Sequence, residues 1–517
     1  MRAAWMQQAY ETSVTRTAIL RLRAWARGLA EGSALVRWLT ARPAVPADLW
    51  AGSAVIRAAG RARDALAAAW ARLPGPLRAL PGLAGRVTEL LLLATALVVA
   101  LVPFKRQVGP VPVSVEVVLL ALLAAVWIVH WALRPEHPRR EGPGLRTSAT
   151  GLPATVFDPW FAGFLFVLVL SLVNARSLLE GLQTVARQAS FFVLFYITVD
   201  TARRREGVYR LVDAILAGAL LVGCIGLAQY VLGFDLSVSG LAGEEQIRGR
   251  IGSTQENPNF LSEYLILLIP VALARTLGTN RMAARVYYGA IVLVLLAAEF
   301  LTYTRGGWLG LAVAIAVFVL LVDVRYLLVA AGAGAVAVVA VPGMLERLTG
   351  LLDFSTGSGA FRLNLYRAAL LMWSRSPWLG VGAGNYLEVY PDIIRDYPLL
   401  DLRFHTYSSH NAYLTVAAET GVLGLALFLV IILLALRVAF AGWRHAALRE
   451  DRLLFLGGGC GMIAFLIQSL SNITFFHPRV VLYYWLLLAL LLALYPAAGV
   501  DGAAGPDGGA RGRDRGR

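Results

Sequence analysis

Long apolar runs recur along most of the chain and are separated by shorter polar stretches. They measure about 16 to 25 residues, the length that a helix needs to cross the hydrocarbon core of a bilayer. The run Leu178–Val199 is the weakest of them, because Glu180 and Arg187 are costly at mid-membrane. The pattern predicts an all-α fold, a polytopic transmembrane helical bundle of about twelve spans. The candidate spans are Val87–Phe104, Val113–Leu133, Ala154–Ala175, Leu178–Val199, Leu211–Leu232, Phe260–Ala274, Val286–Tyr303, Trp308–Val322, Tyr326–Val341, Tyr413–Leu436, Leu453–Leu470 and Val480–Tyr495.

The polar stretches divide the chain into five segments. Residues 1–86 hold 13 arginines and four acidic residues, interleaved with Trp and Pro. This composition predicts a basic extension of short amphipathic helices at the cytoplasmic membrane surface. Residues 87–341 contain spans one to nine, residues 342–412 form a long loop, and residues 413–496 contain spans ten to twelve. Residues 497–517, rich in Gly, Asp and Arg, are expected to be a disordered cytoplasmic tail.

Composition and charge agree with a membrane protein rather than a soluble one. The chain is 58% hydrophobic and 15% charged, and its net charge is +15. The arginines cluster in the tails and in alternate loops, which is the positive-inside pattern, so membrane lipids and no nucleic acid are the expected partners. The pattern predicts a multi-pass protein of the cytoplasmic membrane, with both termini cytoplasmic and residues 342–412 extracytoplasmic. Cys224 and Cys460 lie in apolar runs, so neither a disulfide nor a thiolate metal site is expected.

The long loop between spans nine and ten is expected to be partly helical. Loops of about 70 residues within compact domains are usually functional or partly folded. Apolar residues recur at helical spacing from Phe361 to Ser374, and a Pro- and Gly-rich turn follows over Ser376–Tyr386. The spacing therefore predicts a helix and then a turn within this loop.

Four short motifs surround this loop. They are Asn257-Pro258-Asn259-Phe260-Leu261, Thr304-Arg305-Gly306-Gly307-Trp308, Pro377-Trp378-Leu379-Gly380-Val381-Gly382-Ala383-Gly384-Asn385-Tyr386 and Ser409-His410-Asn411-Ala412-Tyr413-Leu414, the last continuing into Ala418–Gly424. In this order they resemble the signatures of the O-antigen ligase and polymerase family. The resemblance implies a membrane glycosyltransferase of cell-surface polysaccharide assembly. Such an enzyme transfers a glycan from a polyprenyl-pyrophosphate carrier to a hydroxyl of a glycan, lipid or protein acceptor, on the extracytoplasmic face and without a metal or other cofactor.

Arg305 and Arg362 are the candidates for binding the pyrophosphate. A lipid pyrophosphate is a competent leaving group, so the transition state needs positive charge near its phosphates more than a proton donor. The guanidinium group suits this need because it binds phosphate oxygens in bidentate fashion. Arg305 lies at the outer end of a span beside Gly306 and Gly307, which permit close approach of the backbone; an interfacial anchor is the alternative. Arg362 matches the arginine that the family places before its Pro- and Gly-rich stretch, although Tyr366 stands where a tryptophan is more usual; a solvated loop arginine is the alternative.

His410 is the candidate general base. An acceptor hydroxyl loses a proton as it attacks the anomeric carbon, and imidazole titrates near pH 6.5, close to the working pH of such a base. The residue lies where the long loop re-enters the membrane, within the Ser-His-Asn-Ala-Tyr motif. His130, His137, His405 and His477 lack such a motif and are expected to be structural or exposed.

Other polar residues near the motifs are candidates for supporting roles. Asn257 and Asn259 either bind sugar or phosphate or cap the sixth span. Asn411 belongs to the same motif as His410. Glu419 lies inside the tenth span and either orients His410 or pairs with an arginine. A structural pairing is favoured, because the nine residues between Glu419 and His410 do not put them on one helical turn.

Several motifs are absent from the sequence, and rival functions remain. No phosphate loop, dinucleotide fingerprint or Asp-x-Asp pair occurs, so a lipid-linked donor is favoured over a nucleotide-linked one. The leading alternative is a secondary transporter, since many spans and intramembrane carboxylates such as Glu263 and Glu299 also suit one, but no internal repeat is evident. These two glutamates are otherwise expected to pair within the bundle. A non-catalytic scaffold for envelope assembly stays open, as does the choice among polymerase, ligase and protein glycosyltransferase.

Overall fold

The computed structural model describes residues 33–44, 54–73, 78–108, 111–134, 141–142, 145–148, 151–234, 250–323, 332, 334, 357–400 and 408–500. The expected ninth span, Tyr326–Val341, lies outside the described residues apart from two glycines. The segment expected to be a disordered tail lies outside them from residue 501 onward, and the last helix continues past Pro496 to Val500.

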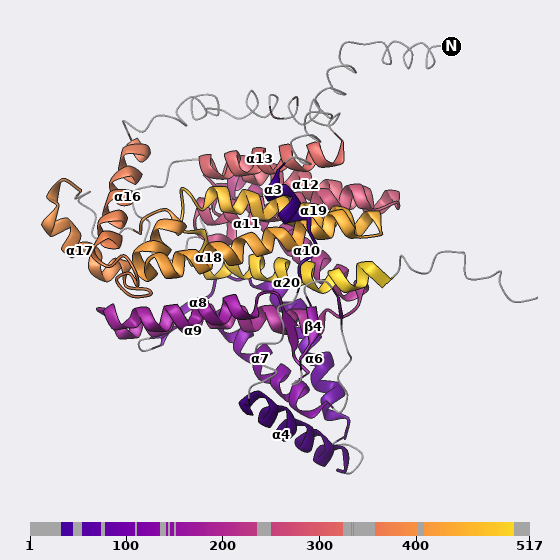
Figure 1. Cartoon of the computed structure of the whole chain (residues 1–517). Coiled ribbons are helices and arrows are strands. Elements are labelled where there is room, and N and C mark those ends of the chain that lie inside the picture. Colours follow the sequence, from indigo (N-terminus) through magenta and orange to yellow (C-terminus); the bar gives the residue numbers. More distant parts are fainter. Residues whose placement is uncertain are drawn as a thin grey trace, which may run out of the picture.

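Helices dominate the described chain, as the apolar pattern predicts (Figure 1). In chain order they are α3 (Ala34–Thr40), α4 (Ala54–Ala71), α6 (Leu80–Val98), α7 (Val115–Leu133), α8 (Asp158–Ser171), α9 (Leu178–Thr201), α10 (Arg205–Leu232), α11 (Pro258–Gly278), α12 (Met282–Leu301), α13 (Arg305–Val322), α16 (Gly357–Arg375), α17 (Tyr386–Asp396), α18 (Ala412–His445), α19 (Arg449–Gln468) and α20 (Pro478–Val500). Within the described residues, each expected span coincides with one of these helices.

The membrane assignment rests on the length and apolar character of these helices. Within the described residues, nine helices are long and apolar enough to cross a membrane, namely α6, α7, α9, α10, α11, α12, α13, α18 and α20. The chain is therefore an α-helical multi-pass membrane protein. The total of about twelve spans stays a prediction, because one expected span lies outside the described residues.

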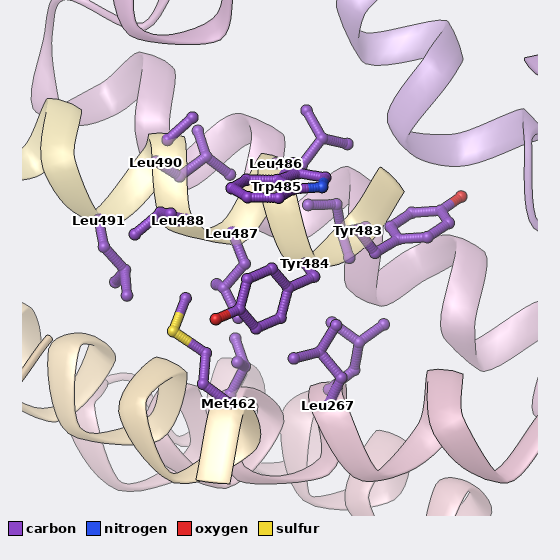
Figure 2. Packing of buried hydrophobic residues seen from close by; sticks show 14 of the residues in the cluster. Leu267, Met462, Tyr483, Tyr484, Trp485, Leu486, Leu487, Leu488, Leu490 and Leu491 are labelled. Atoms are coloured by element: carbon purple, nitrogen blue, oxygen red, sulfur yellow. The ribbon is translucent and has the colours of Figure 1, made fainter. Parts of the chain in front are cut away.

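The last helix, α20, runs through the centre of the bundle. In an 18-residue apolar stretch of α20, 89% of the residues are buried inside the protein, against 22% in α7 and 28% in α12. Its sequence is apolar on every side, which is typical of a helix that others enclose. Figure 2 shows Tyr484 directed toward Met462 of α19 and Leu267 of α11. On another side of α20, Trp485 packs edge-on against Phe192 of α9, with ring centroids 5.2 Å apart.

The segment before α18 folds into α16 and α17, which lie together at one end of the bundle, on the left in Figure 1. The predicted helix Phe361–Ser374 lies within α16 and is confirmed. The two helices share a small apolar cluster that includes Leu365 and Met372 of α16, Tyr390 of α17 and Ala418 of α18. Because α18 contributes to this cluster, the segment is packed onto the membrane bundle.

Most spans have different bounds from those that hydropathy indicates, and the first and the third are examples. The first, expected at Val87–Phe104, is α6, which begins at Leu80 with Pro81 in its first turn. The third, expected from Ala154, is α8, which begins at Asp158. The Asp158 carboxylate accepts hydrogen bonds from the backbone N–H and the hydroxyl of Thr155, at 3.0 and 2.5 Å. These bonds terminate the extended chain before the helix and set its first residue.

Two small antiparallel sheets depart from the predicted all-α fold. After α6 the chain forms a hairpin of β1 (Lys105–Val108) and β2 (Val111–Ser114), in which Lys105 pairs with Ser114. A second sheet has the order β3-β4-β5, made of β3 (Glu141–Gly142), β4 (Leu145–Thr147) and β5 (Pro153–Thr155). The strands are two to four residues long, too short for an alternating pattern to be legible in the sequence.

Helices of the basic extension pack on the bundle. Arg63 of α4 is 4% exposed and donates to the carbonyl groups of Trp131 and Arg134, at the end of α7, at 3.1 and 2.6 Å. The guanidinium group of Arg437, on α18, lies 4.9 Å from the ring centre of Trp38 of α3. An arginine of the extension, Arg63, and one of the bundle, Arg437, thus hold the extension against the bundle in addition to carrying charge.

Candidate active site

The starts of α11, α13 and α18 meet the end of α19 at one end of the bundle, which we call the motif end. The N–H of Ala412, the first residue of α18, donates to the carbonyl groups of Ser469 and Asn472 at 2.9 and 3.1 Å. Gln468, the last residue of α19, donates its Nε2 to the carbonyl of Asn259 in the first turn of α11, at 3.2 Å. Motifs that are far apart in the sequence are therefore adjacent in space.

His410 immediately precedes α18 in a strained backbone conformation. Its φ is +49°, in the left-handed region that L-residues rarely adopt. The neighbours on both sides are firmly held. The Ser409 hydroxyl is 2.6 Å from that of Thr415 and accepts the N–H of Asn411 at 3.1 Å. Asn411 caps α18 by accepting the N–H of Leu414 at 3.0 Å. These bonds fix the backbone that presents the imidazole.

The surroundings of His410 disfavour its protonated form. Burial lowers its pKa from 6.5 to about 4, aided by the positive charge of Arg362 and by nearby His477, while a hydrogen bond with the Asn472 side chain acts in the opposite direction. The pKa of this histidine therefore lies below the ordinary imidazole value on which the choice of base was argued. The imidazole is neutral at pH 7 and has a lone pair with which to accept a proton.

Arg362 lies in α16, close enough to His410 to lower its pKa. The ring of the preceding residue, Phe361, stands edge-on to the His410 imidazole, with centroids 6.3 Å apart. One turn further along α16, the Tyr366 hydroxyl donates to the carbonyl of Leu470 at 2.8 Å. These contacts fix α16 against the turn that follows α19, and they bring two predicted site residues, Arg362 and His410, together.

Arg305 is the first residue of α13 and is half-buried at the motif end. The two glycines that follow it allow close packing there. A Cβ added to Gly306 would strike the hydroxyl of Ser471, and one added to Gly307 would strike the carboxylate of Glu299. The start of α13 is thus pressed against neighbouring elements with no room for a side chain at either position. This packing holds Arg305 at the motif end; its binding of pyrophosphate stays a prediction.

Asn257 and Asn259 organise the start of α11. Asn257 is its N-cap, since its Oδ1 accepts the N–H of Asn259 at 2.8 Å. Asn259 Oδ1 accepts hydrogen bonds from the Arg250 guanidinium at 3.0 Å and from the Thr304 hydroxyl at 3.2 Å. Arg250 also donates to the carbonyl of Thr302 at 2.7 Å and so joins the starts of α11 and α13. From the sequence alone, Arg250 is only a positively charged residue in an outer loop, and no motif indicates this role.

Glu419 anchors the Pro- and Gly-rich turn rather than His410. Its carboxylate accepts the backbone N–H groups of Gly384 at 2.9 Å and Tyr386 at 3.4 Å. The N–H of Gly382 donates to the Glu419 carbonyl at 3.0 Å. These contacts agree with the structural role that was favoured for Glu419. Its partner, however, is the backbone of a turn rather than an arginine side chain.

A kink in α18 makes room for this turn. Gly421 interrupts the helix with φ +67° and ψ −167°, and Gly380 in the turn also has φ +67°. A Cβ on Gly421 would strike the backbone of Trp378, and one on Gly380 would strike the backbone next to Thr420. Glycine is required at both positions, because the turn lies directly on the unwound part of the helix.

A buried polar network that sequence reasoning missed lies beside His410. Glu263 of α11 is fully buried, and its Oε1 accepts a hydrogen bond from Asn472 Nδ2 at 2.5 Å. Its Oε2 lies 2.7 Å from Nδ1 of His477. Asn472 also accepts the N–H of Ala412, two residues after His410, at 3.1 Å through its backbone carbonyl. The prediction that Glu263 pairs within the bundle is confirmed, but its partners are 209 and 214 positions away, and no local motif marks them.

A cavity of about 880 Å³ lies next to this network, between α7 and α9. Much of its wall is apolar, and two lining side chains, Val117 and Val193, are 46% and 40% exposed, so the cavity reaches the outer surface of the bundle. Polar and basic side chains also line it, among them Lys105, Arg187, His477 and Arg479. Glu116 and Glu256 line the cavity too, and Arg479 pairs with both, at 3.8 and 3.3 Å. Lys105 and Arg187 supply further positive charge beside the apolar wall, a combination that suits an amphiphile with an anionic head.

Comparison with known proteins finds one family model that matches part of the chain. Residues 290–429 match a family model described as O-antigen ligase. The matched segment runs from α12 into the first half of α18 and contains Arg305, Arg362, His410 and Glu419. No curated protein matches the chain. Among the described residues, no group of three or more His, Cys, Asp or Glu side chains is arranged to hold a metal ion.

Proposed function

Residues 290–429 assign this chain to the O-antigen ligase family, and from that premise we propose that it transfers a glycan from a polyprenyl-pyrophosphate carrier to an acceptor hydroxyl. A ligase-type role in polysaccharide assembly follows from the family; the donor and the acceptor are the proposal. The observation that carries it is that α16 brings Arg362 and the half-buried His410 together at the motif end, where the ring of Phe361 stands 6.3 Å from the imidazole and Arg362 helps to keep that imidazole neutral.

The reaction requires a base on one side of the anomeric carbon and positive charge on the other. The acceptor oxygen forms its bond to the anomeric carbon while the bond from that carbon to the pyrophosphate oxygen breaks. His410 takes the proton that the acceptor hydroxyl loses, and Arg362 and Arg305 stabilise the pyrophosphate as its negative charge develops. Pyrophosphate beside Arg362 also offsets the positive charge that lowers the pKa of His410, which makes the imidazole a stronger base in the complex.

The cavity between α7 and α9 supports a lipid-linked donor. A polyprenyl carrier needs an apolar surface open to the bilayer for its tail and cations for its phosphates. The cavity has both, with Lys105 and Arg187 among its basic side chains. His477, at the polar part of the cavity, is bonded to Glu263, which also bonds Asn472, and the Asn472 carbonyl accepts the N–H of Ala412 next to the His410 segment. The tail would therefore lie within a few side chains of the proposed base.

The orientation of the motif end is also a proposal. We expect it to face the extracytoplasmic side of the cytoplasmic membrane, with both termini cytoplasmic. The supporting observation is that the connections at the opposite end carry most of the loop arginines, for example Arg203 and Arg204 before α10, Arg281 before α12 and Arg444 near the end of α18. An active site on that side would meet glycans already carried across the membrane.

The family match favours an enzyme over the transporter that hydropathy alone also allows. A decisive assay uses purified protein in liposomes with a synthetic polyprenyl-pyrophosphate oligosaccharide. Longer glycan chains identify a polymerase, and product that forms only with an added lipid or peptide acceptor identifies a ligase. Movement of the oligosaccharide across the bilayer without any new glycosidic bond would favour the transporter.

The proposed base is tested in the same assay. His410→Ala is expected to lower the transfer rate by about 100- to 10,000-fold, the usual contribution of general acid–base catalysis. Arg362→Ala is expected to slow transfer and weaken donor binding. Arg367→Ala, which removes an exposed arginine from the same helix, and His445→Gln, at the other end of α18, are the matched controls. Wild-type transfer by a well-folded His410→Ala protein would refute the proposed function.

A further inference from the structure

Positive charge gathers where α3 of the basic extension packs on α18, at the end of the bundle opposite the motif end. The described segment around α3, residues 33–44, and the part of α18 after its kink, residues 422–445, contain arginines and no acidic residue. Carboxylates elsewhere at this end already have arginine partners in the bundle, namely Asp200 with Arg134, Asp213 with Arg275 and Asp451 with Arg205. We call the place where Arg42, Arg437 and Arg444 come together the α3 seam.

Arg437 is held in a fixed orientation by the end of α3. Its Nε donates to the carbonyl of Ala41 and its Nη2 to that of Arg42, both at 3.3 Å, while the ring centre of Trp38 lies 4.9 Å from the guanidinium. Two turns further along α18, Nε2 of His445 lies 3.0 Å from the carbonyl of the last residue of α3. A guanidinium has five N–H donors, and the two bonds to α3 use two of them. The remaining donors of a half-exposed, immobilised cation are left for another partner.

Two further arginines stand next to this guanidinium. The carbonyl of Arg42 is one of its acceptors, so the Arg42 side chain starts beside it. Arg444 follows Arg437 by seven residues, which places both on one face of α18, about 10 Å apart along the helix axis. Arg42 and Arg444 are exposed, and within the part of the chain that the structure describes neither side chain makes a hydrogen bond or an ion pair. Three guanidinium groups without a carboxylate suit the oxygens of a phosphate.

An exposed apolar strip leads along α18 to the α3 seam. Leu429 and Leu433 are 39% and 41% exposed, and they precede Arg437 by eight and four residues, so all three lie on one face of the helix. The exposed Ala426 extends this face, and from Ala426 to Arg437 it measures about 16 Å, close to the hydrocarbon thickness of one leaflet, about 15 Å. Trp38, at the other side of Arg437, is a residue type that favours the membrane interface. An apolar strip one leaflet long that ends at cations has the shape and chemistry of a phospholipid site.

We infer that the α3 seam binds an anionic phospholipid of the membrane. The phosphate contacts Arg437, Arg42 and Arg444, and an acyl chain lies along the strip that Leu429 and Leu433 expose. An anionic headgroup is preferred because a zwitterionic one carries a positive charge of its own toward the arginines, and a free phosphate leaves the apolar strip uncovered. With this end on the cytoplasmic side, the α3 seam faces a leaflet whose surface is negative. The bound lipid joins the extension to the bundle, since its phosphate touches residues of both. The inference concerns a site remote from the motif end and does not depend on the proposed function.

The test measures the Kd of single phospholipids by native mass spectrometry of the full chain in detergent. The probes are phosphatidylglycerol, phosphatidylcholine and, without acyl chains, glycerol 3-phosphate. The test variant carries Arg42→Gln and Arg444→Gln together and keeps Arg437, so the bonds that hold α3 stay in place. The wild type is expected to bind phosphatidylglycerol more tightly than phosphatidylcholine and to bind glycerol 3-phosphate far more weakly than either lipid. The double variant is expected to bind phosphatidylglycerol about 25-fold more weakly, because each arginine near a headgroup contributes about fivefold. Its Kd for phosphatidylcholine is expected to stay within about twofold of the wild type, because a zwitterionic headgroup has no net charge for the arginines to attract.

The matched control carries Arg204→Gln and Arg281→Gln, which remove the same charge from exposed residues before α10 and α12 at the same end of the bundle. It is expected to bind both lipids as the wild type does. An equal loss of phosphatidylglycerol binding in the control would show a general attraction of a basic face and overturn the inference. Equal affinity of the wild type for the two lipids, or binding of glycerol 3-phosphate as tight as that of the lipid, would overturn it as well. Should the double variant not fold, each single variant is expected to show its own fivefold loss, and wild-type binding in both would refute the site.

Discussion

The contact between Glu419 and the Pro- and Gly-rich turn makes a local, measurable prediction. Glu419→Ala removes the acceptor for the N–H groups of Gly384 and Tyr386 while leaving the backbone bond from Gly382 in place. The turn leads directly into α17, so we expect α17 to open more often in the variant. The membrane bundle itself is expected to stay folded.

The size of the effect follows from the two bonds that are lost. A hydrogen bond to a charged acceptor is worth about 1.5–3 kcal/mol. The bond to Gly384, at 2.9 Å, counts in full, whereas the bond to Tyr386, at 3.4 Å, adds little. The docked turn is therefore destabilised by about 2–3 kcal/mol, which corresponds to an increase of about 30- to 150-fold in the population of the open form. Glu419→Gln keeps one acceptor oxygen and is expected to give a smaller increase.

Hydrogen–deuterium exchange with mass spectrometry measures this opening in the peptide that covers Tyr386–Asp396. The matched control is Glu388→Ala, which removes an exposed glutamate from α17. We expect faster exchange in Glu419→Ala and wild-type exchange in Glu388→Ala. Since α16 shares an apolar cluster with α17, donor KM should rise in the same variant as Arg362 loses its fixed place. Unchanged exchange in Glu419→Ala, or an equal increase in the control, would refute the proposed anchoring.

Two further predictions follow from the motif end. Arg362→Leu removes a positive charge that lowers the pKa of His410, so the acid limb of the pH profile of residual transfer is expected to move to higher pH. Arg362→Lys keeps the charge and should leave the acid limb in place. A shift to lower pH in Arg362→Leu would contradict this account. Gly307→Ala is expected to lower the thermal unfolding temperature measured by dye binding, because a Cβ there would strike the Ser262 hydroxyl and the start of α13 would have to shift. Gly82→Ala in α6, with open space around it, is the control and should be neutral or slightly stabilising.

The helices were largely predictable from the sequence because bilayer thickness imposes a length that an apolar run either meets or does not. What hydropathy could not set was where each helix begins and ends. α8 starts at Asp158 because of a hydrogen bond with Thr155, and α18 bends at Gly421 because a turn lies against it. Both features depend on single contacts that leave the average hydropathy of the run unchanged.

The candidate site was predictable only as far as its residues lie in motifs. His410 and Arg362 were found in this way, and the structure brings them together. Glu263 was expected only to pair within the bundle, and Asn472 was not identified, since the contact between them joins positions 209 apart. An intramembrane glutamate was a signal that some partner exists, but without the fold nothing in the chain identifies that partner.

Backbone strain gives an independent reason to locate chemistry at the motif end. Among the described residues, the non-glycine residues with positive φ are Ser253 and Glu256 before α11, Tyr303 before α13 and His410 before α18. Each such conformation costs about 1–3 kcal/mol and persists only where surrounding contacts outweigh it. Several are visibly held, as Ser253 is by the Gln229 side chain, which accepts its N–H at 2.9 Å. These strained residues all lie just before helices at one end of an otherwise regular bundle. A preorganised site needs such rigidly held backbone, because its catalytic and binding side chains must be in place before the substrate arrives.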